Sequence, residues 1–138
     1  MATAADAELI LKLYELRTEA TMRAARKFVA GFNPSSFDEL RALQGDHEAY
    51  WRQVISYWEM ASALVLHGAL DPDLFLDTNG EPFYYYAKFT PFFGDYRKAL
   101  GQPFMPKFAK LLEKYPAMQE RYTAMLARMQ AAKTQAAG

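Results

Sequence analysis

The sequence predicts an all-α protein, a compact single-domain bundle of about five long helices and two short ones. Apolar residues recur at the three- and four-residue spacing of amphipathic helices along almost the whole chain, and no useful length alternates as a strand would. Glycine and proline interrupt this pattern at intervals that suit helix ends. With 138 residues, of which 51% are hydrophobic, the chain is long enough to bury one core without disulfides.

The first long helix is expected from about Ala4 to Ala30, because Gly31, Asn33 and Pro34 then end it. Most of its surface is apolar or small, and six of its charged residues form one polar stripe: Glu8, Lys12, Glu15, Glu19, Arg23 and Arg26. Such a wide apolar arc predicts contact with more than one neighbouring helix.

Two further helices are expected in the first half of the chain. Ser36, with Glu39 three residues later, is a capping-box pattern and predicts a short helix that ends before Gly45. A long helix should follow from about Asp46 to His67 and end at Gly68. Two aromatic pairs on it are seven residues apart, which is two helical turns, so they share one face: Tyr50-Trp51 and Tyr57-Trp58.

The stretch GEPFYYYAKFTPFFGDY, residues 80–96, holds eight aromatic residues among seventeen. It follows one helical turn at about 72–76 and predicts an amphipathic helix from about Pro82 to Leu100, kinked at Pro91. Phe83 and Tyr84 fall outside the predicted core-facing stripe, which comprises Tyr85, Tyr86, Phe89, Phe92, Phe93, Tyr96 and Leu100. Aromatic residues at helical spacing usually pack in a core; the alternative is a stacking platform for a ligand.

The C-terminal part predicts two more helices, opened by Pro103 and Pro116, and a frayed tail over about 131–138. Four residues of the last helix recur at i, i+4, i+7 and i+11, and form a candidate interaction surface: Met118, Tyr122, Met125 and Met129. Such a stripe is usually core or an oligomer seam, and the alternative is an adaptable binding surface.

Charge is distributed unevenly although the net charge is zero. Residues 1–87 hold 7 Lys/Arg and 13 Asp/Glu, whereas residues 88–138 hold 9 and 3. The simpler interpretation is that the two halves complement each other. The alternative is that the basic half binds nucleic acid or an anionic surface, although the sequence contains no recognisable motif of a nucleic-acid-binding module.

Catalytic and metal signatures are missing from the sequence. There is no cysteine, His47 and His67 are not in an HExxH pattern, and neither GxGxxG nor GxxxxGK occurs. We therefore expect no enzyme activity and no cofactor. No stretch is long and apolar enough for a membrane span or a secretory signal, so we expect a cytoplasmic protein.

Two polar residues lie in apolar surroundings and define a candidate ligand pocket. Arg17 is near the middle of the apolar arc of the first helix, and Glu59 sits within SYWEMASALVL. The structural interpretation is an ion pair or two boundary residues. The functional alternative is a polar anchor in a small apolar pocket together with Tyr57, Trp58 and His67.

Residues 57–115 resemble a group of uncharacterised bacterial helical proteins classed as domains of unknown function. The resemblance rests on Tyr57-Trp58-Glu59, on Gly68 to Asp71, on the aromatic run to Pro91, on Arg97, and on Phe108 to Leu112. It implies a helical fold and no established activity.

Together these observations favour a non-enzymatic protein-interaction or oligomerisation module, either a homo-oligomer or a subunit for a protein partner. A small-ligand-binding protein with an aromatic pocket is one alternative. A binder of nucleic acid or of an anionic surface through the basic C-terminal half is the other.

Overall fold

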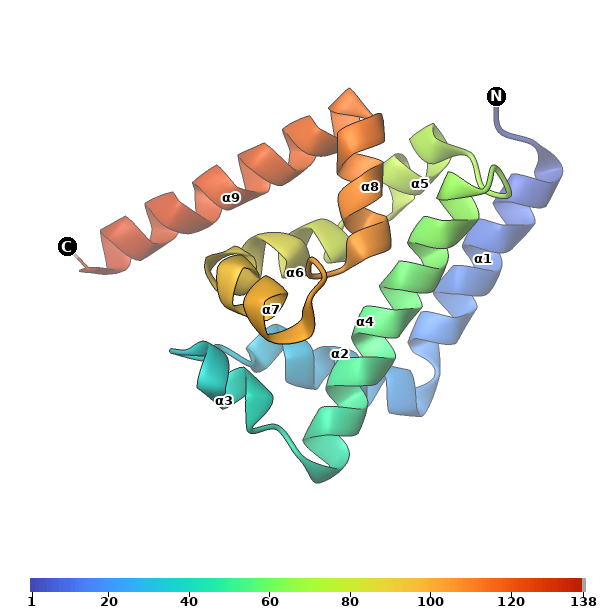
Figure 1. Cartoon of the computed structure of the whole chain (residues 1–138). Helices are drawn as coiled ribbons and strands as arrows, with labels where there is room; N and C mark the ends of the chain where they lie inside the picture. Colours follow the sequence, from blue (N-terminus) through green and yellow to red (C-terminus); the bar gives the residue numbers. More distant parts are fainter. Residues whose placement is uncertain (138) are drawn as a thin grey trace. The chain divides into compact units, whose positions relative to one another are not determined.

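A computed structural model describes residues 1–137 and confirms the all-α fold (Figure 1). Within these residues there is no strand, and no helix is long and apolar enough to cross a membrane. The helices are α1 (Ala4–Thr18), α2 (Ala20–Gly31), α3 (Phe37–Arg41), α4 (Gly45–Leu66), α5 (Pro72–Thr78), α6 (Glu81–Lys88), the short 3₁₀ helix η1 (Thr90–Phe92), α7 (Phe93–Leu100), α8 (Pro106–Lys114) and α9 (Pro116–Ala137).

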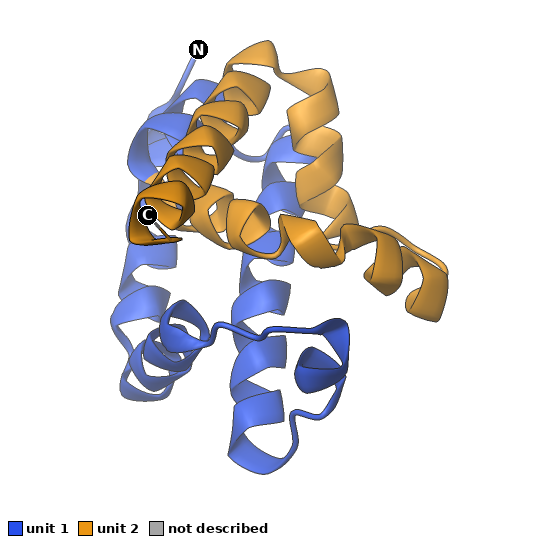
Figure 2. Ribbon diagram, turned by 90° about the vertical axis from the view of Figure 1, so that its left-hand side faces the viewer, with its two compact units in different colours: residues 1–78 blue, residues 79–138 orange. Residues whose placement is uncertain are grey.

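The helices form two compact units, residues 1–78 and residues 79–137 (Figure 2). Unit 1 comprises α1 to α5, and unit 2 comprises α6 to α9. The expectation of one domain over the whole chain stays a prediction.

In unit 1, α1 and α4 run in opposite directions, and α2 packs against α4 (Figure 1). The hydroxyl of Tyr57 on α4 donates a hydrogen bond to the backbone carbonyl of Leu13 on α1. Trp58 and Val54 are fully buried on α4. Met22, Ala25 and Val29 form the buried face of α2, at the spacing of an amphipathic helix.

The single helix expected from Ala4 to Ala30 is wrong, because the chain breaks at Glu19. Glu19 is extended, with φ −61° and ψ 143°, and its carboxylate accepts hydrogen bonds from the backbone N–H groups of Thr21 and Met22. A carboxylate at this place satisfies N–H groups that the first turn leaves unpaired. The break leaves α1 and α2 with separate buried faces, and several apolar residues of the predicted arc on α1 stay exposed, Leu11 and Tyr14 most of all.

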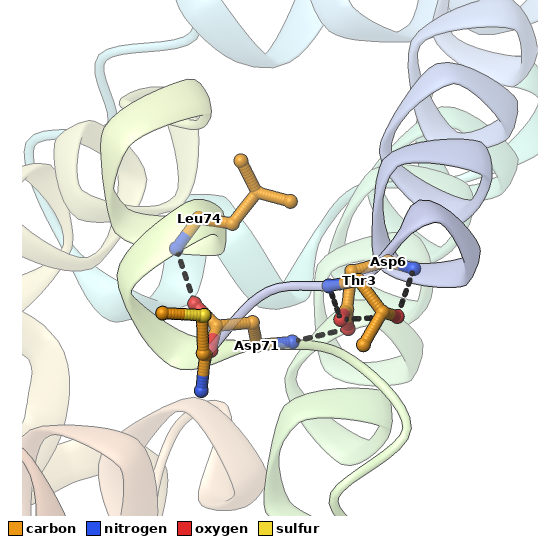
Figure 3. A network of polar contacts seen from close by, with 5 residues as sticks. Thr3, Asp6, Asp71 and Leu74 are labelled. Atoms are coloured by element: carbon orange, nitrogen blue, oxygen red, sulfur yellow. Dashed lines mark hydrogen bonds and ion pairs between the residues drawn. The ribbon is translucent and has the colours of Figure 1, made fainter.

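A polar network joins the start of α1 to the start of α5 (Figure 3). The buried carboxylate of Asp6 accepts hydrogen bonds from the Thr3 backbone N–H at 2.6 Å, the Thr3 hydroxyl at 2.8 Å and the Asp71 N–H at 2.8 Å. Asp71 in turn caps α5 by accepting from the Leu74 N–H at 2.9 Å. These bonds lower the pKa of Asp6, the backbone bond from Thr3 most of all.

The capping pattern at α3 is present, shifted by one residue. The Ser36 hydroxyl accepts from the Glu39 N–H, as predicted, but the Glu39 carboxylate accepts from the N–H of Ser35 rather than Ser36. The helix ends at Arg41, and Gly45 begins α4 instead of ending α3.

In unit 2, α9 packs against α6 and α8. An aromatic cluster fills the space between them, and we call it the unit 2 ring cluster: Phe83, Tyr86, Phe89, Phe104 and Phe108. All five side chains are buried. The predicted core role is therefore found in the first half of the segment 80–96, up to Phe89, whereas Phe92, Phe93 and Tyr96 of the predicted stripe are only half-buried.

The details of that segment differ from the prediction. Pro91 does not kink one helix; it lies in η1, which separates α6 from α7. Phe83, expected outside the core stripe, is fully buried, whereas Leu100, expected inside it, is 47% exposed. Because the chain changes direction at η1, positions on either side of it no longer share one helical wheel.

The helix expected from Pro103 begins instead at Pro106, where proline suits the first turn. Phe104 and Met105 precede it and are buried, with Met105 in the left-handed region at φ 46°. α9 begins at Pro116 as predicted and is helical to Ala137, through residues where we expected fraying. Gly138 lies outside the described residues.

Candidate functional site

Arg17 and Glu59, for which the sequence allowed an ion pair or two boundary residues, do not form an ion pair with each other. The Arg17 guanidinium lies over the ring of Trp58 at 5.4 Å and over that of Tyr14 at 5.6 Å. It makes no hydrogen bond or ion pair with any residue in the described range, Glu59 included. The Arg17 cation is therefore held by aromatic faces and by its place in the last turn of α1, where a positive charge is favoured.

The other members of the predicted pocket join helices. Trp58 is fully buried and packs edge-on against Tyr57 at 4.8 Å, and its indole Nε1 has no hydrogen-bond partner among the described residues. Tyr57 ties α4 to α1 through its hydroxyl. His67 is exposed and ends α4, where its backbone N–H donates to the Ala63 carbonyl. These contacts support a packing role.

The predicted stripe on α9 is divided by burial. Met118 is 1% exposed, and the Tyr122 hydroxyl forms a 2.9 Å hydrogen bond with the hydroxyl of Thr90. Both belong to the packing of unit 2. Met125 and Met129 are half-buried, so a binding role for the stripe stays a prediction for these two residues alone.

One hollow on the surface of unit 1 is lined by apolar rings. It has a volume of about 500 Å³, lies at the C-terminal end of α2 and is shallow and largely open to solvent. Its lining comes from one helical face and the residues just beyond it: Ala24, Lys27, Phe28, Gly31, Phe32 and Asn33. We call it the α2 hollow.

Aromatic rings from α2 and α4 meet at the α2 hollow. Phe28 stacks on Phe32 at 5.4 Å and on His47 at 4.3 Å, with interplanar angles of 18° and 16°. Tyr50 lies 6.2 Å from Phe28, and Trp51 meets Phe32 edge-on at 6.3 Å. None of these five rings is fully buried, which distinguishes this group, the unit 1 ring cluster, from the buried rings of unit 2.

Gly31 is the lining residue without a side chain. A Cβ atom placed on Gly31 would have no atom within 4 Å, and its φ is not in the left-handed region. Asn33 turns the chain after the helix, and its side-chain amide donates to the Gly31 carbonyl at 3.2 Å. The end of α2 therefore leaves space where a side chain would otherwise stand.

Lys27 gives the lining its one charge. It is exposed, and it forms no ion pair with any residue in the described part of the chain. Arg23 lies one turn earlier on α2, beside the Glu19 carboxylate, whose pKa is lowered chiefly by the backbone N–H groups of Thr21 and Met22. The α2 hollow thus combines apolar rings with one uncompensated cation.

Lys88 on α6 has an altered pKa. Burial lowers the pKa of Lys88 to about 8. Its ammonium group lies 5.7 Å from the Tyr84 ring and 5.4 Å from the Phe89 ring. No group of three or more His, Asp or Glu side chains within residues 1–137 is placed to hold a metal ion.

The sequence prediction did not include the α2 hollow. Phe28 belongs to the apolar arc of the first predicted helix, and Gly31 is predicted only to end that helix. The available signal was that Phe28, Phe32 and the Tyr50-Trp51 pair exceed what the core of one small unit needs, but only the structure shows that they meet.

The family comparison agrees with the resemblance noted above and extends it. The model of a family described as "Domain of unknown function (DUF4760)" matches residues 2–115. The chain belongs to this family. The match covers all of unit 1, including the α2 hollow, and unit 2 up to the end of α8. No curated protein and no solved structure matches the chain.

Proposed function

We propose that the protein is a non-enzymatic protein-interaction module of the cytoplasm, and that the α2 hollow receives an apolar side chain of a partner protein. The observation that carries this proposal is the hollow itself, about 500 Å³ in volume and lined by Phe28 and Phe32. The residues around it offer apolar contact and one cation.

The shape of the hollow favours a protein partner over a free small molecule. Pockets for small molecules bury about 70–90% of the ligand surface, which a hollow open on one side cannot do. A side chain presented by a partner gains further contacts around the rim, where His47, Tyr50 and Trp51 extend the apolar surface. Aromatic residues are enriched at the energetic centres of protein interfaces.

The partner is either another protein or a second copy of this chain. Leu11 and Tyr14 are 67% and 59% exposed on α1, so self-association has apolar surface to use. Sedimentation of the whole chain, with and without a substitution in the α2 hollow, separates the two cases.

The test blocks the hollow without disturbing the fold. In Gly31→Leu the new side chain enters open space, and replacing a helical glycine does not cost helix stability. The matched control is Gly94→Leu, since Gly94 is also exposed, helical and free of neighbours within 4 Å. Peptides are selected from a displayed library on the whole chain, and binding to each variant is measured by calorimetry or polarisation.

We expect the selected peptides to share a large apolar residue. Gly31→Leu should weaken their binding by more than about tenfold, since an interface anchor contributes about 2 kcal/mol or more. Gly94→Leu should bind as the wild type does. Equal binding to wild type and to Gly31→Leu, together with a sedimentation profile that Gly31→Leu leaves unchanged, would overturn the proposal.

A further inference from the structure

We infer that the partner segment pairs an aromatic anchor with a neighbouring carboxylate, Asp or Glu, which reaches Lys27. This inference rests on the proposed function and specifies the partner's chemistry. It names an acidic-aromatic peptide as the occupant of the α2 hollow.

The aromatic part follows from the rings already present. Phe28 and Phe32 stack almost in parallel, as do Phe28 and His47, so an aromatic anchor would join a group of half-buried rings that already pack on one another. A pair of aromatic rings contributes about 0.5–1.5 kcal/mol more than the burial of its apolar area alone. An aliphatic anchor would lack this additional contribution. A Cβ placed on Gly31, which also lines the hollow, would have no atom within 4 Å, so this residue presents no steric block to an incoming ring.

The acidic part follows from the charge of the lining. Lys27 is its one charged residue, and no ion pair within residues 1–137 neutralises it. Glu48, the residue after His47, forms an ion pair with Arg52, with a nitrogen–oxygen distance of 3.7 Å. A carboxylate on the partner therefore complements the rim, and a basic side chain would meet like charge.

Asn33 supports a peptide rather than an isolated aromatic acid. Its amide nitrogen already donates to the Gly31 carbonyl at 3.2 Å, which fixes the side chain at the edge of the hollow. Its amide oxygen is then an acceptor for a peptide N–H. An anchor, a carboxylate and a backbone N–H are found together in one short peptide segment.

Nucleic acid fits these observations less well. Bases could stack on Phe28 and Phe32, but binding a nucleic-acid strand requires several cations along the phosphate backbone. The lining supplies one. An oligonucleotide is therefore a competing probe in the test.

The experiment is a charge-swap cycle read by ¹⁵N NMR titration of the whole chain. The probe is an eight-residue capped peptide with Trp next to Glu in a Gly-Ser background, compared with versions in which Glu is Gln or Lys. The protein variants are Lys27→Gln and Lys27→Glu, with Lys133→Glu as the control for net charge, since Lys133 is exposed on α9.

We expect the acidic peptide to shift resonances of the hollow and to bind about two- to fivefold more weakly to Lys27→Gln, the range for an exposed ion pair. Lys27→Glu should prefer the Lys peptide over the Glu peptide, which reverses the wild-type order. Lys133→Glu should keep the wild-type order.

Two failures are distinguishable. If Gly31→Leu abolishes peptide binding but the charge at position 27 does not change the affinity, this inference is overturned and the proposed interaction module is still supported. Peptide binding that Gly31→Leu does not affect would overturn both. Tighter binding of a short single-stranded oligonucleotide at the same resonances, lost with rising salt, would overturn the acidic-peptide inference in favour of nucleic acid.

Discussion

The two ring clusters use the same kinds of side chain in different ways. In unit 2, Phe83 and Phe108 are fully buried and meet edge-on at 5.0 Å, with Tyr86 5.2 Å from Phe108. In unit 1, Phe28 and Phe32 are only half-buried and stack at 5.4 Å beside an open hollow. One cluster holds a core together, and the other leaves ring surface exposed to solvent.

The difference comes from where each cluster sits along its helices. The unit 2 rings lie between α6, α8 and α9, so helices cover them from more than one direction. The unit 1 rings lie where α2 ends and α4 begins, and Gly31 adds no side chain above them. Aromatic surface that stays in water at a helix end does not stabilise the fold as buried aromatic surface does. Its presence there favours a role in binding.

The largest expected effect is on the buried cluster. Phe108→Ala should lower the free energy of unfolding by about 3–5 kcal/mol, because it leaves a cavity among packed rings. Urea denaturation followed by circular dichroism measures this loss. A loss below about 1 kcal/mol would mean that the unit 2 ring cluster does not carry the stability that its burial implies.

The next effect concerns pH and the network at the start of α1. The pKa of Asp6 is lowered, chiefly by its hydrogen bonds from Thr3, so its contribution to stability is complete above the ordinary pKa of an aspartate and is lost as pH falls through the folded pKa. Asp6→Asn should therefore have a lower Tm at pH 7, and the difference from wild type should narrow in acid. If the Tm difference between Asp6→Asn and wild type stays constant from pH 7 to pH 2.5, the lowered pKa of Asp6 is contradicted.

A smaller effect is expected in the exposed cluster. Phe32→Ala should cost less than about 2 kcal/mol of unfolding free energy, since its ring is already partly in water. The matched measurement is urea denaturation beside Phe108→Ala under the same conditions. Equal losses for the two variants would remove the contrast between the clusters.

Much of the fold could be predicted because it depends on local chemistry. Helical periodicity, Ser36 as a cap and Pro116 as a helix start all act over a few residues, and each was found where expected. The break at Glu19 was missed because no glycine or proline marks it. The cause of the break is the cap formed by the Glu19 side chain. In the sequence, a glutamate at this position is equally compatible with an uninterrupted helix.

The candidate site could not be predicted to the same degree, since it depends on distant residues. Arg17 and Trp58 were chosen from the sequence and do meet, but as cation and ring rather than as part of an Arg17–Glu59 pair. The α2 hollow is lined by residues 24–33, but the unit 1 ring cluster beside it requires residues near position 30 and residues near position 50 to come together, which no periodicity encodes. Phe83 shows the same limit, because a turn at η1 changed which face was inside.

The smallest expected effect on stability has the opposite sign. Gly31→Ala should raise the free energy of unfolding by up to about 1 kcal/mol, since it removes backbone freedom from the unfolded chain and its Cβ meets nothing within 4 Å. Gly94→Ala, in an equally open helical position of unit 2, should give a similar gain when both are measured by thermal melting. If Gly31→Ala alone also weakens peptide binding, the open floor of the hollow is retained for binding at the expense of stability. A destabilising Gly31→Ala beside a stabilising Gly94→Ala would instead show that the glycine serves the fold.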